Sequence, residues 1–136
     1  MANNTVLRWL PGGMRFISTD STGHSVVVST TDEGLGMKPS ELILSALSAC
    51  SSVDVVQILE KKKTPLTSLE VTVTADQDKD PPWAFRKIHL HFKQKGNNLV
   101  EKDVAYAIQL SEHKYCSVAA TLRGVAEITT SFEILE

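Results

Sequence analysis

Hydrophobic and polar residues alternate along most of the chain, a pattern typical of strands that bury one face. Turn-forming residues, chiefly glycine, proline and aspartate, separate the alternating stretches. The pattern predicts six strands, at residues 5–10, 13–18, 24–30, 67–76, 84–94 and 125–134. Between the third and fourth strands, and again before the sixth, the alternation gives way to patterns typical of helices.

The first helix, predicted over residues 40–62, is apolar almost all the way round. Pro39 suits its first turn because the missing N–H of proline would have no intrahelical partner there. A lysine cluster at 61–63 and Pro65 end it. A helix without a wide polar face must be covered on every side, and one small sheet covers only one face. We therefore expect a second copy of the chain to supply the remaining cover, in a homodimer.

Two more helices are predicted near the end of the chain, an amphipathic one over 98–113 and a short one that starts at Tyr115-Cys116. The resulting order, three strands, a helix, two strands, two helices and a strand, is typical of an α+β fold with antiparallel pairing. A chain of 136 residues is the size of one domain, so we expect a single domain over residues 1–136.

Composition narrows the class of protein. The chain is 42% hydrophobic and 22% charged, as in ordinary soluble globular proteins. Its net charge of −2 argues against nucleic acid as the main partner. We find no signal-peptide pattern and expect no apolar run long enough to span a bilayer, hence no membrane association. These features predict a cytoplasmic protein, in which cysteines are kept reduced and a disulfide is transient.

The two cysteines, Cys50 and Cys116, are the candidate chemistry. Cys50 lies in the middle of the apolar helix, and Cys116 lies near a helix N-terminus, where the macrodipole favours a thiolate. A buried cysteine also serves as a small core residue, so two inert cysteines are the plain alternative. Thiol redox chemistry is the hypothesis that uses both residues.

A metal site and a hydrolase are weaker alternatives. The cysteines form no C-x-x-C pair, so the usual spacing of a structural zinc site is absent. His89 and His91 share the polar face of a predicted strand, which is simplest to interpret as a solvated face. His113 precedes Cys116 by three positions, but no signature of a Cys–His hydrolase accompanies it. We expect neither a metal nor an organic cofactor.

Two segments resemble the OsmC/Ohr family of thiol peroxidases. They are KPSELILSALSAC at 38–50 and EHKYCSVAATLRGVAEIT at 112–129. The resemblance lies in the proline-led helix start, the small residues before a mid-helix cysteine, and the second cysteine before a short helix and the last strand. The Pro-Ser-Glu-Leu start is similar to that of a less-studied branch. The order of elements agrees along essentially the whole chain.

The resemblance implies an OsmC-like fold in which antiparallel sheets wrap a central buried helix, as an intertwined homodimer with active sites at the interface. It implies that Cys50 is the peroxidatic thiolate and that Cys116 resolves its sulfenic acid as a Cys50–Cys116 disulfide. The substrate would be an organic hydroperoxide, because the apolar surroundings of Cys50 suit a hydrocarbon tail. A dithiol, either a lipoyl group or a small thiol, would be the reductant.

The family's arginine and glutamate are also implied by the resemblance. The arginine lowers the pKa of the thiolate, and a glutamate at the start of the central helix holds it. Arg15 is the best match because it follows a glycine-rich turn, with Arg8 as the fallback. Glu41 stands one position after the family's glutamate, where this chain has Ser40. This departure favours the alternative function, a redox-sensing or ligand-binding module with little turnover.

Overall fold

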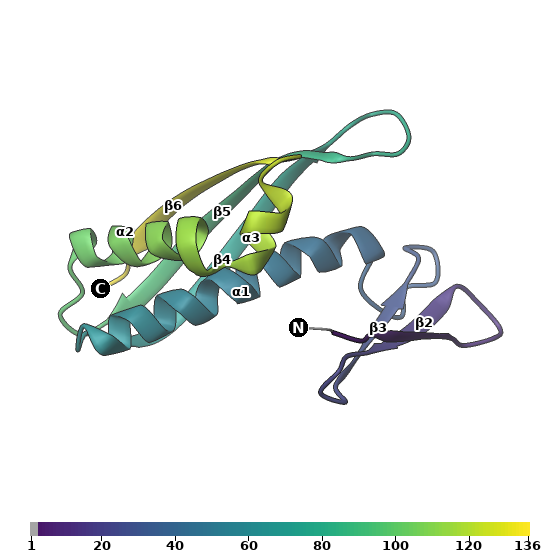
Figure 1. Cartoon of the computed structure of the whole chain (residues 1–136), viewed down its shortest axis with the longest axis horizontal. Coiled ribbons are helices and arrows are strands. Elements are labelled where there is room, and N and C mark those ends of the chain that lie inside the picture. The colour runs from purple at the N-terminus through teal and green to yellow at the C-terminus, as the bar shows by residue number, and fades with distance from the viewer. Residues whose placement is uncertain (1–2) are drawn as a thin grey trace. The chain divides into compact units, whose positions relative to one another are not determined.

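The computed structural model describes residues 3–136 and divides into two compact units, the first ending at Ile43 and the second beginning at Leu44 (Figure 1). Each unit contains one three-stranded sheet. The elements are β1 (Val6–Trp9), β2 (Arg15–Thr19), β3 (Ser25–Ser29), α1 (Pro39–Lys61), β4 (Leu66–Gln77), β5 (Phe85–Gly96), α2 (Glu101–Leu110), the π-helix η1 (Ser111–Tyr115), α3 (Ser117–Leu122) and β6 (Glu127–Ile134).

The first unit is an antiparallel sheet in the order β1-β2-β3. The loop after β3 folds back on this strand, and Met37 exchanges backbone hydrogen bonds with Val27 and Ser29. Val28 is the only hydrophobic residue of residues 3–43 that is fully buried. β1 is exposed along its whole length, including Leu7 and Trp9. This sheet therefore presents apolar side chains that its own unit does not cover.

The second unit has a dense core. α1 and α2 pack against one face of the sheet, whose order is β4-β5-β6 (Figure 1). Every second residue of β5 is buried there, as the alternating pattern predicts. The buried hydrophobic residues of this core are Leu47, Val55, Leu59, Ile88, Leu90, Phe92, Val104, Ala107, Ile108, Cys116, Ala119 and Ala126.

The predicted α+β order of elements is confirmed, and α1 differs from its predicted range by one residue at each end. The prediction of purely antiparallel sheets is wrong, because β5 and β6 pair in parallel. A parallel pair needs a long crossover between its strands, and α2, η1 and α3 supply it. The predicted helix over 98–113 ends at Leu110 and continues as the π-helix η1.

α1 is less covered within the single chain than a central buried helix would be. Its buried residues, Leu47, Ser51, Val55 and Leu59, are four apart and form one narrow stripe. By length and composition α1 could cross a membrane, so the expectation of no apolar run that long is wrong. Its buried stripe lies in the core of the second unit, as in core helices of soluble proteins.

Candidate active site

The structure brings the two cysteines together, although they lie far apart in the sequence. Cys50 is half-buried in α1, and Cys116 is 3% exposed between η1 and α3. Both are free thiols, Cys50 packs against the core cluster that contains Cys116, and each thiol shifts the pKa of the other. The two sulfur atoms therefore form one local site within the second unit.

Cys116 lies in this site because the chain is not helical at this residue, between η1 and α3. Its backbone N–H donates to the carbonyl of Ser111 at 2.8 Å, which closes the π-turn. Cys116 then leaves the helical region, with φ −77° and ψ 105°, and caps the N-terminus of α3. Its Sγ accepts a hydrogen bond from the N–H of Ala119 at 3.4 Å. Because Cys116 is a cap, the free N–H groups of the first turn of α3 lie beside the sulfurs.

The surroundings of Cys50 favour its thiolate. Burial is the largest single influence and by itself raises the pKa of Cys50. Hydrogen bonds from the thiol of Cys116, from the backbone N–H of Val118, and from the hydroxyl and N–H of Ser117 together outweigh it. The pKa of Cys50 is therefore below its usual value.

Cys116 is shifted in the opposite direction. Burial is the largest influence and raises the pKa of Cys116, and the neighbouring Cys50 adds to the rise. The N–H groups of Ala119 and Val118 lower it, and the pKa of Cys116 is about 11. The expectation that the dipole of the short helix makes Cys116 a thiolate is therefore wrong. The N–H groups of Ser117 and Val118 favour the thiolate of Cys50, while Sγ of Cys116 accepts the N–H of Ala119. At neutral pH, Cys116 is a protonated thiol that donates to its neighbour.

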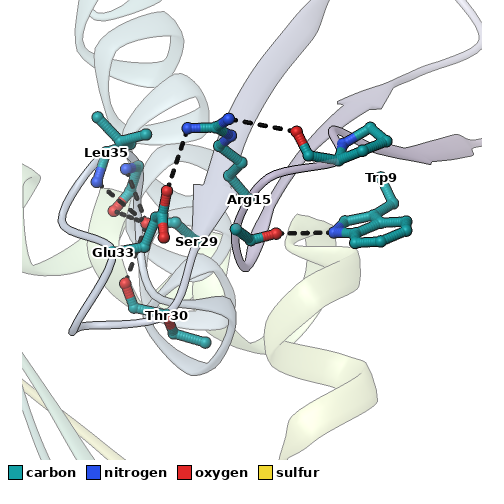
Figure 2. Close-up of polar contacts among 9 residues, drawn as sticks. Trp9, Arg15, Ser29, Thr30, Glu33 and Leu35 are labelled. Atoms are coloured by element: carbon teal, nitrogen blue, oxygen red, sulfur yellow. Dashed lines mark hydrogen bonds and ion pairs between the residues drawn. The ribbon is translucent and has the colours of Figure 1, made fainter.

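Arg15 has a carboxylate partner that the sequence analysis missed. Its Nη1 lies 3.2 Å from Oε1 of Glu33, and its Nη2 donates to the carbonyl of Pro11 at 3.3 Å (Figure 2). The loop that carries Glu33 is held by Ser29, whose Oγ accepts from the N–H of Gly36 at 2.9 Å. No pattern in the sequence marks Glu33, because the ion pair depends on how this loop folds back toward β2.

Glu41, the predicted partner of Arg15, has a different neighbour. Its carboxylate pairs with Nζ of Lys38 at 3.3 Å, one turn earlier at the start of α1. Both side chains are about half exposed. A surface pair of this kind contributes little to stability. The structure thus assigns the two predicted residues, Arg15 and Glu41, to separate ion pairs.

His89 and His91 form a cross-strand hydrogen-bonded chain with β6. The ring nitrogens of His89 contact Thr129 and Ser131 at 2.6 and 2.8 Å, and those of His91 contact Ser131 and Glu133 at 2.7 and 2.8 Å. Every ring nitrogen is thereby engaged. Within residues 3–136, no three His, Cys, Asp or Glu side chains are grouped so as to hold a metal ion.

Comparisons with known proteins agree with this architecture. A family model described as OsmC-like protein matches residues 31–131. Protein YhfA of Escherichia coli K12 is 34% identical over 129 residues, which cover 95% of this chain and 96% of YhfA. An OsmC-like protein from Mycoplasma pneumoniae superimposes with a TM-score of 0.84 at 17% identity, covering 100% and 99% of the two chains. The organic hydroperoxide resistance protein OhrB of Bacillus subtilis superimposes with a TM-score of 0.64 at 15% identity, covering 98% of each chain.

Proposed function

The chain belongs to the OsmC-like family, and from that premise we propose that it is a thiol-dependent peroxidase that reduces organic hydroperoxides. The family includes cysteine-based hydroperoxide peroxidases. The single observation that carries the proposal is the opposite shift of the two neighbouring thiols, Cys50 toward a thiolate and Cys116 toward a protonated thiol. Because the two thiols are neighbours, an oxidised Cys50 has a second thiol within reach, which two separate core cysteines would not provide.

The first step is attack of the Cys50 thiolate on one oxygen of the peroxide. An S–O bond forms as the O–O bond breaks, and the sulfur is oxidised by two electrons to a sulfenic acid. The departing alkoxide takes up a proton and leaves as an alcohol. Because Cys50 is packed against the apolar core cluster, a peroxide with a hydrocarbon tail fits these surroundings better than hydrogen peroxide.

In the second step, the sulfur of Cys116 attacks the sulfenic sulfur of Cys50. A disulfide forms, the thiol gives up its proton, and the sulfenic oxygen leaves as water. The high pKa of Cys116 keeps it from competing for peroxide in the first step. A dithiol reductant, a lipoyl group or a small thiol, then supplies two electrons and two protons to restore both cysteines.

Arg15 is proposed as the cation that further favours the Cys50 thiolate, with Glu33 as the carboxylate that orients it. Glu33 fills the role expected of Glu41, because the ion pair of Arg15 is with Glu33. Glu41 is proposed only as a negative charge at the N-terminus of α1, where it complements the dipole. Removing Glu33 should therefore affect the thiol chemistry more than removing Glu41.

We also propose that the protein works as a homodimer. In the single chain, α1 leaves Ile43 and Val53 exposed, and β1 leaves Leu7 and Trp9 exposed. Apolar surface of this extent, distributed over two elements, is typical of an interface. Static light scattering should show a dimer at micromolar concentration. A folded monomer there would refute it.

We propose that the protein is soluble and acts in the cytoplasm, where reducing conditions keep both cysteines as thiols. No nucleic acid or membrane takes part in the proposed reaction, and its other participants are the peroxide and the dithiol reductant. Neither reaction step calls for a metal or an organic cofactor, because the thiols carry the electrons.

Intact mass after one equivalent of cumene hydroperoxide tests the proposal. The wild-type chain should lose two hydrogens, Cys116→Ser should gain one oxygen on Cys50, and Cys50→Ser should remain unchanged. Turnover should follow when dihydrolipoamide is added. If the wild type gains oxygen instead of losing hydrogens, Cys116 does not resolve Cys50.

The second candidate function is redox sensing with little turnover. Its supporting observation is the departure at the start of α1, where Glu41 pairs with Lys38 and not with Arg15. A sensor would form the same disulfide but would be reduced slowly. Steady-state turnover with dihydrolipoamide separates the two functions, since only a peroxidase sustains many cycles.

A further inference from the structure

A buried polar contact joins the two segments that carry the cysteines. The hydroxyl of Ser111 donates to Oδ2 of Asp54 at 2.7 Å and lies 3.4 Å from both the carbonyl and the Oγ of Ser51. Ser111 is fully buried at the first position of η1, and Ser51 is 5% exposed. Ser51 and Asp54 follow Cys50 in α1 by one and four positions, so Asp54 lies one helical turn beyond the thiol.

Ser111 is also bonded to the second cysteine. Its carbonyl accepts the N–H of Cys116 at 2.8 Å, which is the bond that closes the π-turn. Its own N–H donates to the carbonyls of both Ala107 and Ile108, so the helical path changes at this residue. Ser111 thus contacts the helix of Cys50 through its side chain and bonds to Cys116 through its backbone.

A π-turn is rarer than an α-turn, and such turns occur often at functional sites. Here the N–H of Cys116 closes the turn, and within residues 3–136 the side-chain hydrogen bonds of Ser111 all go to α1. A disulfide forms only when the two cysteines meet within a narrow range of separation and orientation. Whatever holds η1 against α1 therefore controls how readily Cys116 reaches the sulfur of Cys50.

We propose that Ser111, held by the carboxylate of Asp54, is a positioning residue for the resolving step. This inference rests on the proposed function and deepens it. The Ser111–Asp54 contact keeps η1 docked on α1, so that Cys116 is aligned when the sulfenic acid forms on Cys50. Its main effect is on disulfide closure, because the fully formed Cys50 thiolate attacks the peroxide from α1 and Cys116 takes no part in that bond.

Rapid-quench mass spectrometry with dimedone, which traps sulfenic acid, separates the two steps. In Ser111→Ala, the disulfide should close more slowly by on the order of tenfold to a hundredfold, the scale of a misaligned reacting group. At a pH above the alkylation midpoint of Cys50 in each variant, where the thiolate is fully formed, sulfenic acid should form at the wild-type rate. Dimedone should consequently capture a larger fraction of Cys50. Wild-type closure rates in this variant would overturn the proposal.

Variants of Asp54 test the same contact from α1. Asp54→Asn retains an oxygen that accepts the hydroxyl of Ser111 and should close its disulfide nearly as fast as the wild type. Asp54→Ala should be as slow as Ser111→Ala, and the double variant no slower than either, because both remove one contact. A double variant whose rate of disulfide closure falls by the product of the two single effects would contradict the proposal. Asp54→Ala also provides the test if Ser111→Ala does not fold.

Ser48→Ala is the matched control, because the hydroxyl of Ser48 donates within α1, to the carbonyl of Ser45 at 3.2 Å. It should leave both steps unchanged. If Ser111→Ala slows sulfenic acid formation as much as closure, and raises the pH at which Cys50 is alkylated, Ser111 acts on the thiolate and the positioning role is wrong. If Cys116→Ser forms no sulfenic acid at all, the proposed function itself fails, a result distinct from either of these.

Discussion

The two sheets of the molecule are built from similar alternating sequences but differ in what covers them. The β4-β5-β6 sheet has strands of 12, 12 and 8 residues and carries the buried cluster of the second unit. The β1-β2-β3 sheet has strands of four and five residues and buries a single large hydrophobic side chain, Val28. Alternation alone therefore predicts a strand, but it does not reveal whether the chain itself covers the apolar face.

This difference explains how the two units divide their roles. The second unit holds both thiols in a packed environment, where burial and hydrogen bonds shift the pKa values of Cys50 and Cys116 apart. The first unit carries Arg15 on a sheet with little core of its own and Glu33 on the loop after that sheet. In the proposed dimer, the uncovered sheet would gain its stability from association. The predictions below test this contrast.

The largest effect is expected for a core substitution in the second unit. Phe92 is fully buried, and Phe92→Ala should lower the free energy of unfolding by about 3–5 kcal/mol. Phe16→Ala in the first sheet is the matched control and should cost clearly less, because Phe16 is only half-buried. Urea denaturation measures both, and equal losses would contradict the contrast between the sheets.

In the same core, replacing a buried amide should raise the free energy of unfolding, not lower it. Gln94 is fully buried, and neither its Oε1 nor its Nε2 has a hydrogen-bond partner within residues 3–136. An unpaired buried polar group costs about 1–3 kcal/mol, so Gln94→Met should raise the free energy of unfolding by about 1 kcal/mol or more. Gln77→Met is the control, since Nε2 of Gln77 donates to the carbonyl of Trp83 at 2.9 Å. A destabilised Gln94→Met would indicate that the amide has a partner in the assembled protein.

The next prediction asks whether the first unit acts on the thiol of the second. A cation near a thiolate favours the charged form, so if Arg15 is the cation proposed above, Arg15→Ala should raise the pKa of Cys50. The thiolate fraction at pH 7 then falls, and peroxide reduction slows. The pH dependence of iodoacetamide alkylation gives the midpoint, with Arg8→Ala and Arg123→Ala as controls that act mainly on stability. A shift in either control but not in Arg15→Ala would show that the arginine is wrongly assigned.

The smallest effect concerns the turn beside Arg15. A Cβ added at Gly13 would overlap the carboxylate of Glu33, which must then move away from Arg15. The partly exposed ion pair contributes less than about 1 kcal/mol, so Gly13→Ala should cost little stability but should move the NMR signal of the Arg15 side chain. Gly124→Ala is the control, because a Cβ there meets no atom within 4 Å. An unmoved Arg15 signal would mean that the ion pair does not need the glycine.

The secondary structure of this protein could be predicted from local pattern. Hydrophobic periodicity reports which side chains share a face, and so α1 and all six strands were predicted within a few residues of their observed ranges. The π-helix η1 was missed because Glu112 to Tyr115 carry no periodic signal that separates a π-turn from an α-turn. The direction of β6 was missed because strand pairing joins residues far apart in the chain.

The sequence by itself determined the α+β order of elements and the long apolar helix, and it identified the two cysteines as the candidate reactive residues. Only the tertiary structure decided that Arg15 pairs with Glu33, and that the pKa values of Cys50 and Cys116 shift in opposite directions. The reason is physical. Periodicity depends on neighbours along the chain, whereas an ion pair or a pKa depends on burial and on donors that folding brings close in space.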